Sequence, residues 1–200
     1  MLRVANKATK NNNFRSINAQ IRAVDDENSR NVVLSFSSEE PYERWFGTEI
    51  LDHSEGACDL SRLEEVGVLL FNHNTDRVIG KVIRTWIENN RGNAEVSFDE
   101  DEASDVIYQK VKSGTLKCTS VWYRVDSWEE VAANKTSADG RFTGPCSIAR
   151  KWMPYEVSIV SVPADATVGV GRNHNNQNEL AYYEAQFQIN LNSVIGGKKL

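Results

Sequence analysis

Short runs of β-branched and aromatic residues dominate this 200-residue sequence, and polar segments with turn residues separate them. Such runs are typical of β-strands. They cover residues 14–25, 30–38, 66–73, 78–88, 93–98, 115–128, 147–152 and 155–162. An alternating β/α fold would need a helix between successive strands, and most of these runs have none between them. The sequence therefore favours a barrel or a rolled sheet.

One clear helix is predicted, over residues 99–114. Acidic residues crowd its first turn, and Lys110 and Lys112 lie in its last, which suits the helix dipole. Gly114 is suited to end it. A shorter helix is predicted over residues 59–65. The expected fold class is thus α+β and mainly β, a β-barrel flanked by helices.

The chain has the length of one domain with tails. Residues 1–13 are polar and rich in asparagine, which predicts a disordered N-terminal segment. Residues 14–171 are predicted to form the domain. Residues 172–200 begin with a run of low apolar content and are predicted to be a linker and a C-terminal tail.

Charge and composition exclude several classes of protein. A net charge of -5 argues against a nucleic-acid partner, whose binding face would need a basic excess. No apolar stretch approaches the length of about 18 residues that a membrane span needs, and the N-terminus does not resemble a secretory signal. Cys58, Cys118 and Cys146 form no CxxC pair, which indicates reduced thiols in the cytosol. These scattered cysteines do not support a metal site.

Three polar residues occupy unusual positions in or beside predicted strands. His73 ends the apolar run LLFNH, Ser120 lies inside KCTSVWYRV, and Glu156 lies inside YEVSIV. Taken singly, each has an ordinary explanation, such as a core histidine with its hydrogen bonds satisfied or a serine bonded to a backbone carbonyl. Taken together, they are the base, the nucleophile and the acid that a catalytic triad requires. Spacing alone does not bring the three together in space.

The other histidines and the neighbouring charges allow simpler interpretations. His53 and His174 lie in polar segments and are predicted to be solvated. Glu156 could form a structural ion pair with Arg150 or Lys151 across a sheet, because a carboxylate in an apolar strand is costly unless it is paired.

Four segments, in this order along the chain, resemble the prohead proteases of tailed bacteriophages over residues 15–172. They are WFGTEILDHS (45–54), LLFNHNTDRVIGKV (69–82), SGTLKCTSVWY (113–123) and PYEVSIVSVPAD (154–165). These serine proteases share a fold with assemblin, the capsid-maturation protease of herpesviruses. The resemblance implies an assemblin-like barrel with His73 as general base, Ser120 as nucleophile and Glu156 as the third member.

The resemblance also implies the setting of the reaction. Such a protease cleaves scaffold and major-capsid-protein segments, and itself, inside the assembling procapsid in the host cytoplasm. A cleavage of its own chain is expected in residues 172–200. No metal or organic cofactor is expected, and a second copy of the chain is a further candidate partner.

Two positions depart from the family pattern. Asn74 follows His73 where the family commonly has an acidic residue, and Trp122 follows Ser120 by two residues where the family often has glycine. The bulky Trp122 indicates a narrower substrate groove or a changed specificity.

Two alternative functions stay open at the level of sequence. The chain could be a capsid-assembly scaffold module that kept the fold and lost the activity. It could also be a cysteine hydrolase, because Cys118 lies two residues before Ser120 and alternate residues of a strand share a face.

Overall fold

The computed structural model describes residues 12–18, 21–23, 29–44 and 46–162. Residues 1–11 and 163–200 lie outside this range, and so do the predicted tail and its expected cleavage. The predicted domain limits therefore stay predictions.

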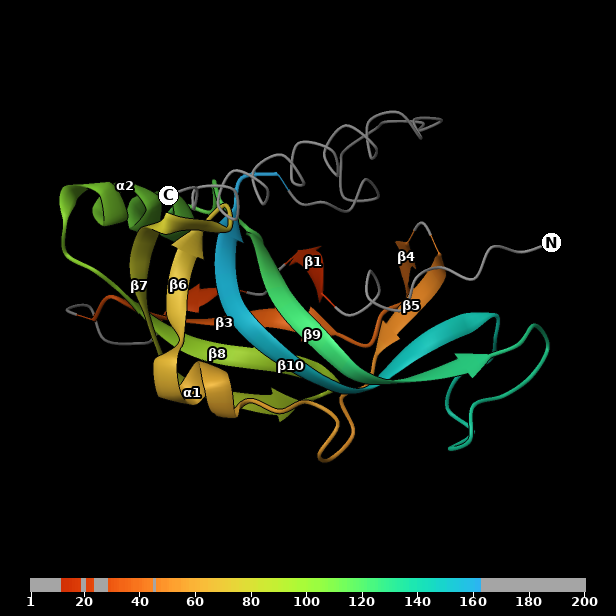
Figure 1. Cartoon of the computed structure of the whole chain (residues 1–200). Coiled ribbons are helices and arrows are strands. Elements are labelled where there is room, and N and C mark those ends of the chain that lie inside the picture. The colour runs from red at the N-terminus through yellow and green to blue at the C-terminus, as the bar shows by residue number, and fades with distance from the viewer. Residues whose placement is uncertain (1–11, 19–20, 24–28, 45, 163–200) are drawn as a thin grey trace, which may run out of the picture.

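Twelve elements follow one another along the chain (Figure 1). They are β1 (Asn12–Asn18), β2 (Arg22–Ala23), β3 (Asn31–Ser38), β4 (Tyr42–Arg44), β5 (Gly47–Leu51), α1 (Ser61–Val66), β6 (Val68–Phe71), β7 (Asn74–Glu88), β8 (Arg91–Phe98), α2 (Glu102–Lys112), β9 (Cys118–Val131) and β10 (Cys146–Val160).

The strands form one sheet with the hydrogen-bonded order β1-β9-β10-β6-β7-β8-β3-β2, and β5 pairs with β10 and β4 with β5. β10 runs parallel to β5 and β6, whereas the other pairs are antiparallel. In Figure 1 the blue β10 lies between β6 and β9. Residues on β10 therefore meet neighbours from distant parts of the sequence.

The sheet curls strongly enough that β3 and β9, which are not neighbours in this order, contact each other. The Thr119 hydroxyl on β9 donates a hydrogen bond to the Ser35 carbonyl oxygen on β3 (2.7 Å). The prediction of a mainly β fold with few helices is confirmed. The predicted barrel is a curled half-barrel, since the strand order in the described residues begins at β1 and ends at β2 without closing.

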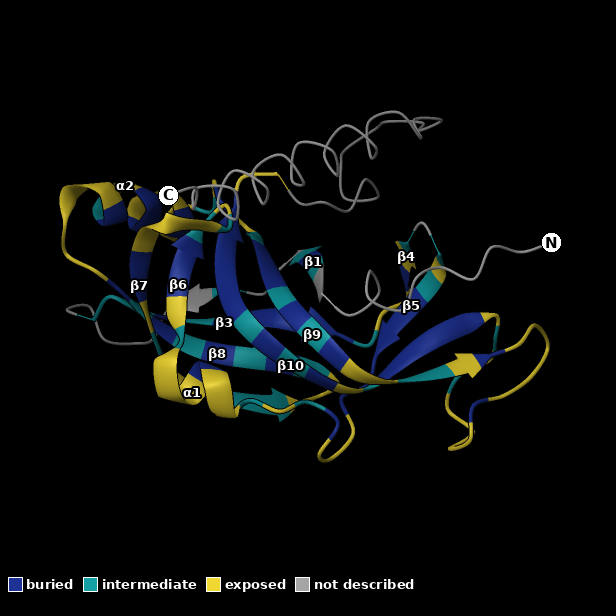
Figure 2. Ribbon diagram, viewed as in Figure 1, coloured by how far each residue is buried: buried dark blue, intermediate teal, exposed yellow. Residues whose placement is uncertain are grey.

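One large cluster of buried residues, drawn from most of the strands and from both helices, forms the main core. Along β8, buried residues alternate with partly exposed ones, as the two-residue period of a strand requires. Trp152 on β10 is among the largest fully buried side chains, and its indole nitrogen donates to the Asp52 carbonyl oxygen (2.7 Å). Figure 2 shows long buried stretches of β10 and an almost wholly exposed α1.

The helices form where the sequence predicts them. In α2 the Asp101 side chain accepts a hydrogen bond from the Ser104 backbone amide and caps the N-terminus. Ile107, Tyr108 and Val111 bury the inner face of this helix. α1 buries only Leu63. Both helices thus pack one side against the main core and expose the other.

Two hairpins use the same two-residue turn. Asn89 and Asn90 join β7 to β8, and Asn72 and His73 join β6 to β7, with positive φ angles of 52°, 57°, 54° and 56° in that order. Two successive residues in the left-handed region match a type I′ turn, whose twist fits antiparallel strands and which asparagine favours. His73 is therefore presented by a turn and not by the strand end that the sequence predicts.

His53 is buried, and the prediction of a solvated side chain is wrong. Its Nδ1 lies 2.9 Å from the Leu51 carbonyl oxygen and its Nε2 lies 2.8 Å from the Ser37 hydroxyl. Because a carbonyl oxygen can only accept, Nδ1 carries the proton and Nε2 accepts from Ser37. Burial lowers the pKa of His53 to about 4, so the ring is neutral in the folded protein near pH 7.

We expect His53 to make the protein less stable as the pH falls from about 6.5 to about 4. An unfolded histidine has a pKa of about 6.5, whereas that of folded His53 is about 4, so the unfolded state binds more protons in this window. The stability that is present above this window decreases across it by about 3 kcal/mol. Urea unfolding at pH 7 and pH 5 checks this. The free energy of unfolding should depend less on pH in His53→Gln than in the unmodified protein. An equal change in the free energy of unfolding between pH 7 and pH 5 in both proteins would exclude His53 as the cause.

Candidate active site

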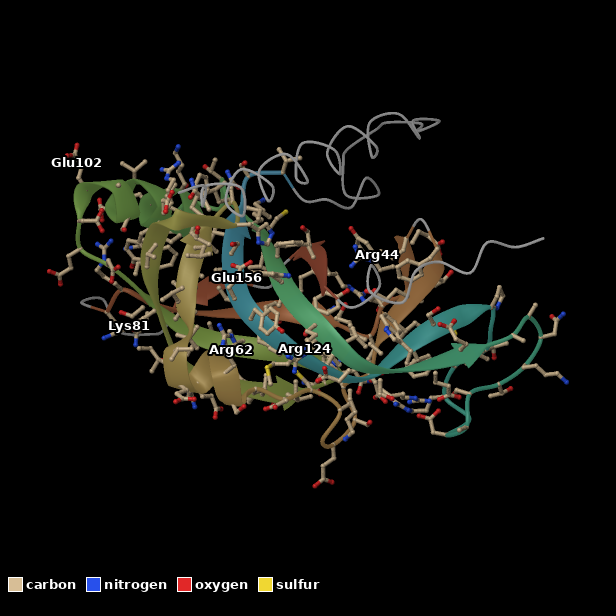
Figure 3. The ribbon with its side chains drawn as sticks, viewed as in Figure 1. Arg44, Arg62, Lys81, Glu102, Arg124 and Glu156 are labelled. Atoms are coloured by element: carbon tan, nitrogen blue, oxygen red, sulfur yellow. The ribbon has the colours of Figure 1, made fainter. Side chains whose placement is uncertain are left out.

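Three side chains form a hydrogen-bonded line across adjacent positions of the sheet. His73 Nε2 lies 2.7 Å from Ser120 Oγ, and His73 Nδ1 is hydrogen-bonded to Glu156 Oε1. Ser120 belongs to β9, Glu156 to β10, and His73 to the turn after β6, which follows the order β9-β10-β6. Figure 3 labels Glu156 on β10, in the region between β6 and β9. The structure thus brings together the three residues that the sequence indicates.

The turn that carries His73 is fixed to the end of β10. The Asn72 backbone amide donates to the Ile159 carbonyl oxygen (2.9 Å), and the Asn72 side-chain oxygen accepts from the Ser161 amide (2.9 Å). The His73 backbone amide donates to Ser158 Oγ (3.0 Å). These bonds join both turn residues to the strand that carries Glu156, which holds the imidazole between its two partners.

Ser158 is a positioning residue that the sequence reasoning missed. Its hydroxyl donates to Glu156 Oε2 (2.8 Å) while accepting from the His73 backbone amide, so one side chain orients both the carboxylate and the turn. In the register of β9 and β10, Ser158 lies directly opposite Ser120. Ser158 could have been found from the strand pattern, because a residue two positions after Glu156 lies on the same face of the strand.

The hydrogen bonds define which nitrogen of His73 can act as a base. An ionised carboxylate only accepts hydrogen bonds, so Nδ1 carries the proton and donates it to Glu156. This leaves the Nε2 lone pair directed at the Ser120 hydroxyl. Ser120 is fully buried, and only 20% of the His73 side chain and 9% of the Glu156 side chain are exposed. The arrangement can therefore take a proton from Ser120 in a site from which most water is excluded.

Cys118 is less well placed for the same role. Within the described residues, no hydrogen bond joins its thiol to His73, whose Nε2 is directed at Ser120. Burial also raises the pKa of the Cys118 thiol, which disfavours the reactive thiolate. These observations favour the serine over the cysteine as nucleophile.

Neither a metal cluster nor a spanning helix occurs in the part of the chain that the structure describes. No group of three or more histidine, cysteine, aspartate or glutamate residues is arranged there to hold a metal ion. None of the helices described has the length and apolar character needed to cross a bilayer.

Aromatic rings line the same face of the sheet next to His73. The Phe14 ring contacts the edge of the His73 ring, with centroids 4.5 Å apart, and stacks on Trp122 at 5.5 Å. Trp122 in turn packs edge-on against Tyr155 at 5.2 Å. The departure from the family pattern at Trp122 thus places a large ring beside the nucleophile.

The alternative partners of Glu156 bind elsewhere. Arg150 pairs with Asp52, Asp139 and Glu129, and the Lys151 ammonium donates to the Gly56 carbonyl oxygen. The interpretation of Glu156 as the partner of either cation is therefore wrong. Its hydrogen bonds go to His73 and Ser158.

Replacing Glu156 with glutamine is expected to lower activity less than removing the nucleophile does. Glu156→Gln should keep roughly 10- to 100-fold more activity than Ser120→Ala. Glutamine keeps the shape and can still accept one hydrogen bond, but it stabilises an imidazolium poorly. Steady-state cleavage rates measure the effect. Glu64→Gln, which changes an exposed carboxylate on α1, is the control. Full activity of folded Glu156→Gln would assign Glu156 a purely structural role.

A comparison with known protein families matches the part of the chain that carries this site. The family model described as caudovirus prohead serine protease matches residues 52–180, a range that contains the whole hydrogen-bonded line. A major capsid protein of Halomonas phage phiHAP-1 is 36% identical over 143 residues, which are 70% of this chain and 23% of that protein. The chain thus spans less than a quarter of the length of that curated relative. No solved structure matches it. The chain belongs to the caudovirus prohead serine protease family.

Proposed function

We propose that this chain is a serine endopeptidase that acts in phage capsid maturation. The observation that carries the proposal is the hydrogen-bonded line from Ser120 through His73 to Glu156. Membership of the prohead serine protease family supports it. We also propose that the curled half-barrel is related to the assemblin fold.

In the proposed reaction, Ser120 Oγ attacks the carbonyl carbon of a peptide bond while His73 Nε2 takes the hydroxyl proton. The same nitrogen then gives this proton to the leaving amine as the C–N bond breaks. A water molecule, deprotonated by His73, hydrolyses the acyl ester and restores Ser120. Glu156 keeps the other proton on Nδ1 and stabilises the imidazolium. The scheme requires no metal or organic cofactor.

We propose scaffold and capsid-protein segments, and the chain itself, as substrates inside the assembling procapsid in the host cytoplasm. The printed description of the family as a prohead protease supports this setting. The name of the relative, a major capsid protein, supports an association with capsid proteins.

Two measurements test the proposed activity. A fluorophosphonate should modify the chain at Ser120, and mass spectrometry of the chain co-expressed with the capsid protein of the same phage should detect shortened products. Ser120→Ala should abolish both signals. A protein that is folded, unreactive towards the phosphonate and without products would contradict the proposal.

A second candidate is a capsid-assembly module without activity. The match to a fraction of a protein named major capsid protein favours it, because a similar sequence there forms part of a longer chain. If this is the role, Ser120→Ala should leave the yield and size of assembled particles unchanged, and no proteolysis should accompany assembly.

A further inference from the structure

Strand β1 lies beside the proposed nucleophile in the sheet. It pairs antiparallel with β9 over its whole length, and Ser16 lies directly opposite Ser120. Ser120 is fully buried, and the Arg15 carbonyl oxygen of β1 lies 3.1 Å from its hydroxyl, so β1 occupies the place that a peptide strand paired with β9 would take. Because β1 is the first strand in the order of the sheet, it can leave β9 without breaking another described ladder.

The backbone of β1 also competes for the proton that the reaction needs. The Ser120 hydroxyl lies 3.1 Å from the Arg15 carbonyl oxygen and 2.7 Å from His73 Nε2. A hydroxyl has one hydrogen, and both of these atoms can accept it. When Ser120 donates to Arg15, it cannot donate to the base. The carbonyl of β1 thus lies beside the nucleophile, where the carbonyl of a substrate would have to come.

The position of β1 leaves two buried donor atoms of Arg15 without a hydrogen bond to any residue that the structure describes. The Arg15 side chain is 1% exposed, and within the described residues its Nε and Nη1 atoms have no hydrogen-bond partner. Burial lowers the pKa of this guanidinium, although Tyr123 and Glu49 act in the opposite direction. Its Nη2 atom donates to the Glu40 carbonyl oxygen. Unsatisfied buried donors destabilise the position that buries them. A strand held in this way can be displaced by one that fits better.

The Phe14 side chain marks a binding position on the face of β9. Its ring stacks on Trp122 with the planes 10° apart and meets the edge of the His73 ring. Phe14 directly precedes Arg15, the residue whose carbonyl meets Ser120. An aromatic side chain at the matching place in a substrate would make the same two contacts.

We propose that the substrate binds as an extended strand in place of β1, and that Trp122 selects an aromatic side chain immediately before the residue that supplies the scissile carbonyl. The proposal rests on the proposed function and adds the class of substrate and a specificity-determining residue to it. Main-chain pairing of the substrate with β9 replaces the pairing that β1 gives up, and Trp122 supplies the selection.

The displacement of β1 can be tested with a reversible lock. Asn18 lies opposite Cys118 in the register of β1 and β9. Directly opposite residues have Cα atoms about 4.5–5.5 Å apart, which a disulfide can bridge. In Asn18→Cys, oxidation should lower the rate of Ser120 labelling by an aromatic diphenyl phosphonate peptide at least about 100-fold, and a reductant should restore it. The matched control, Asn18→Cys with Cys118→Ser, should not respond to the redox conditions.

The outcomes separate the inference from the function on which it rests. Equal rates for the oxidised and reduced proteins, with the disulfide verified by mass, would overturn the displacement of β1. Failure of the disulfide to form would overturn the pairing itself. If the reduced protein reacts with no phosphonate at Ser120, the proposed function fails, and the inference with it.

Selection by Trp122 is tested on the unmodified chain and on one variant. Two phosphonate peptides that carry phenylalanine or alanine immediately before the phosphonate residue should differ in labelling rate, with phenylalanine faster. Trp122→Ala should reduce this preference about three- to tenfold, the loss of one aromatic contact. Trp86→Ala, which removes a half-buried tryptophan of β7, should not change it. No preference in the unmodified chain would overturn the assignment of Trp122.

Discussion

Replacing Ser120 with alanine is expected to lower peptide cleavage by about 10⁴-fold or more and to leave the protein folded. The change removes the only hydroxyl that is hydrogen-bonded to His73 Nε2 in the described residues. It leaves the pairing of β9 with β1 and β10 intact, because that pairing uses the backbone. The cleavage rate and the thermal midpoint, measured on the same sample, separate lost chemistry from lost structure.

Two control variants sharpen this prediction. Ser147→Ala removes another buried hydroxyl, on β10, which donates to Glu130 instead of to the site, and it should keep its activity. Cys118→Ala should also remain active, since the thiol has no bond to the base. Cleavage at the normal rate by Ser120→Ala would reject Ser120 as nucleophile. Loss of cleavage in Cys118→Ala alone would favour the cysteine hydrolase.

Most elements of this fold could be predicted because they follow from local patterns, but β4 and β5 lie outside every predicted strand. The helix at residues 99–114 has its apolar face, its acidic first turn and Gly114 within one segment, and α2 forms inside that range. The sequence could not predict that β10 runs parallel to β6, or that the sheet curls until Thr119 reaches Ser35. Such pairings depend on contacts between residues far apart in the chain, which no local period encodes.

The candidate site could likewise be predicted only in part. Ser120 and Glu156 could be singled out because a polar group in an apolar strand needs a reason to be there. That they meet depends on β10 lying between β9 and β6, which only the folded sheet provides. The pairing of β1 with β9 beside Ser120 had no signal in the sequence, because nothing in the segment around Phe14 indicates its partner strand.

The burial of His53 departs from the sequence prediction for a physical reason. Its neighbours in sequence are polar, and a polar segment usually lies at the surface. Its ring nitrogens, however, find the Ser37 hydroxyl and the Leu51 carbonyl oxygen, and its ring packs edge-on against Trp152 at 5.3 Å. A buried polar group is tolerated when its hydrogen bonds are satisfied, which the flanking residues do not reveal.

Replacing His73 with alanine is expected to lower cleavage nearly as far as Ser120→Ala does, by about 10⁴-fold, because members of a triad act as a unit. Without the imidazole, no other described side chain is hydrogen-bonded to Ser120 and able to take its proton. If a substrate strand replaces β1 as proposed, His73→Ala should still bind a strand-like peptide inhibitor, since β9 and Trp122 remain. A normal cleavage rate in this variant would show that another group is the base.

The same role predicts how the activity of the unmodified protein depends on pH. A protonated imidazole has no lone pair at Nε2, so cleavage should fall on the acid side as His73 takes up a proton. Acid also destabilises the fold through His53, and the two effects must be separated. In His53→Gln the loss of stability in acid should be smaller, whereas the acid limb of the cleavage rate should persist. If that limb disappears with His53→Gln, the pH dependence of cleavage reflects unfolding, and His73 loses this support as the base.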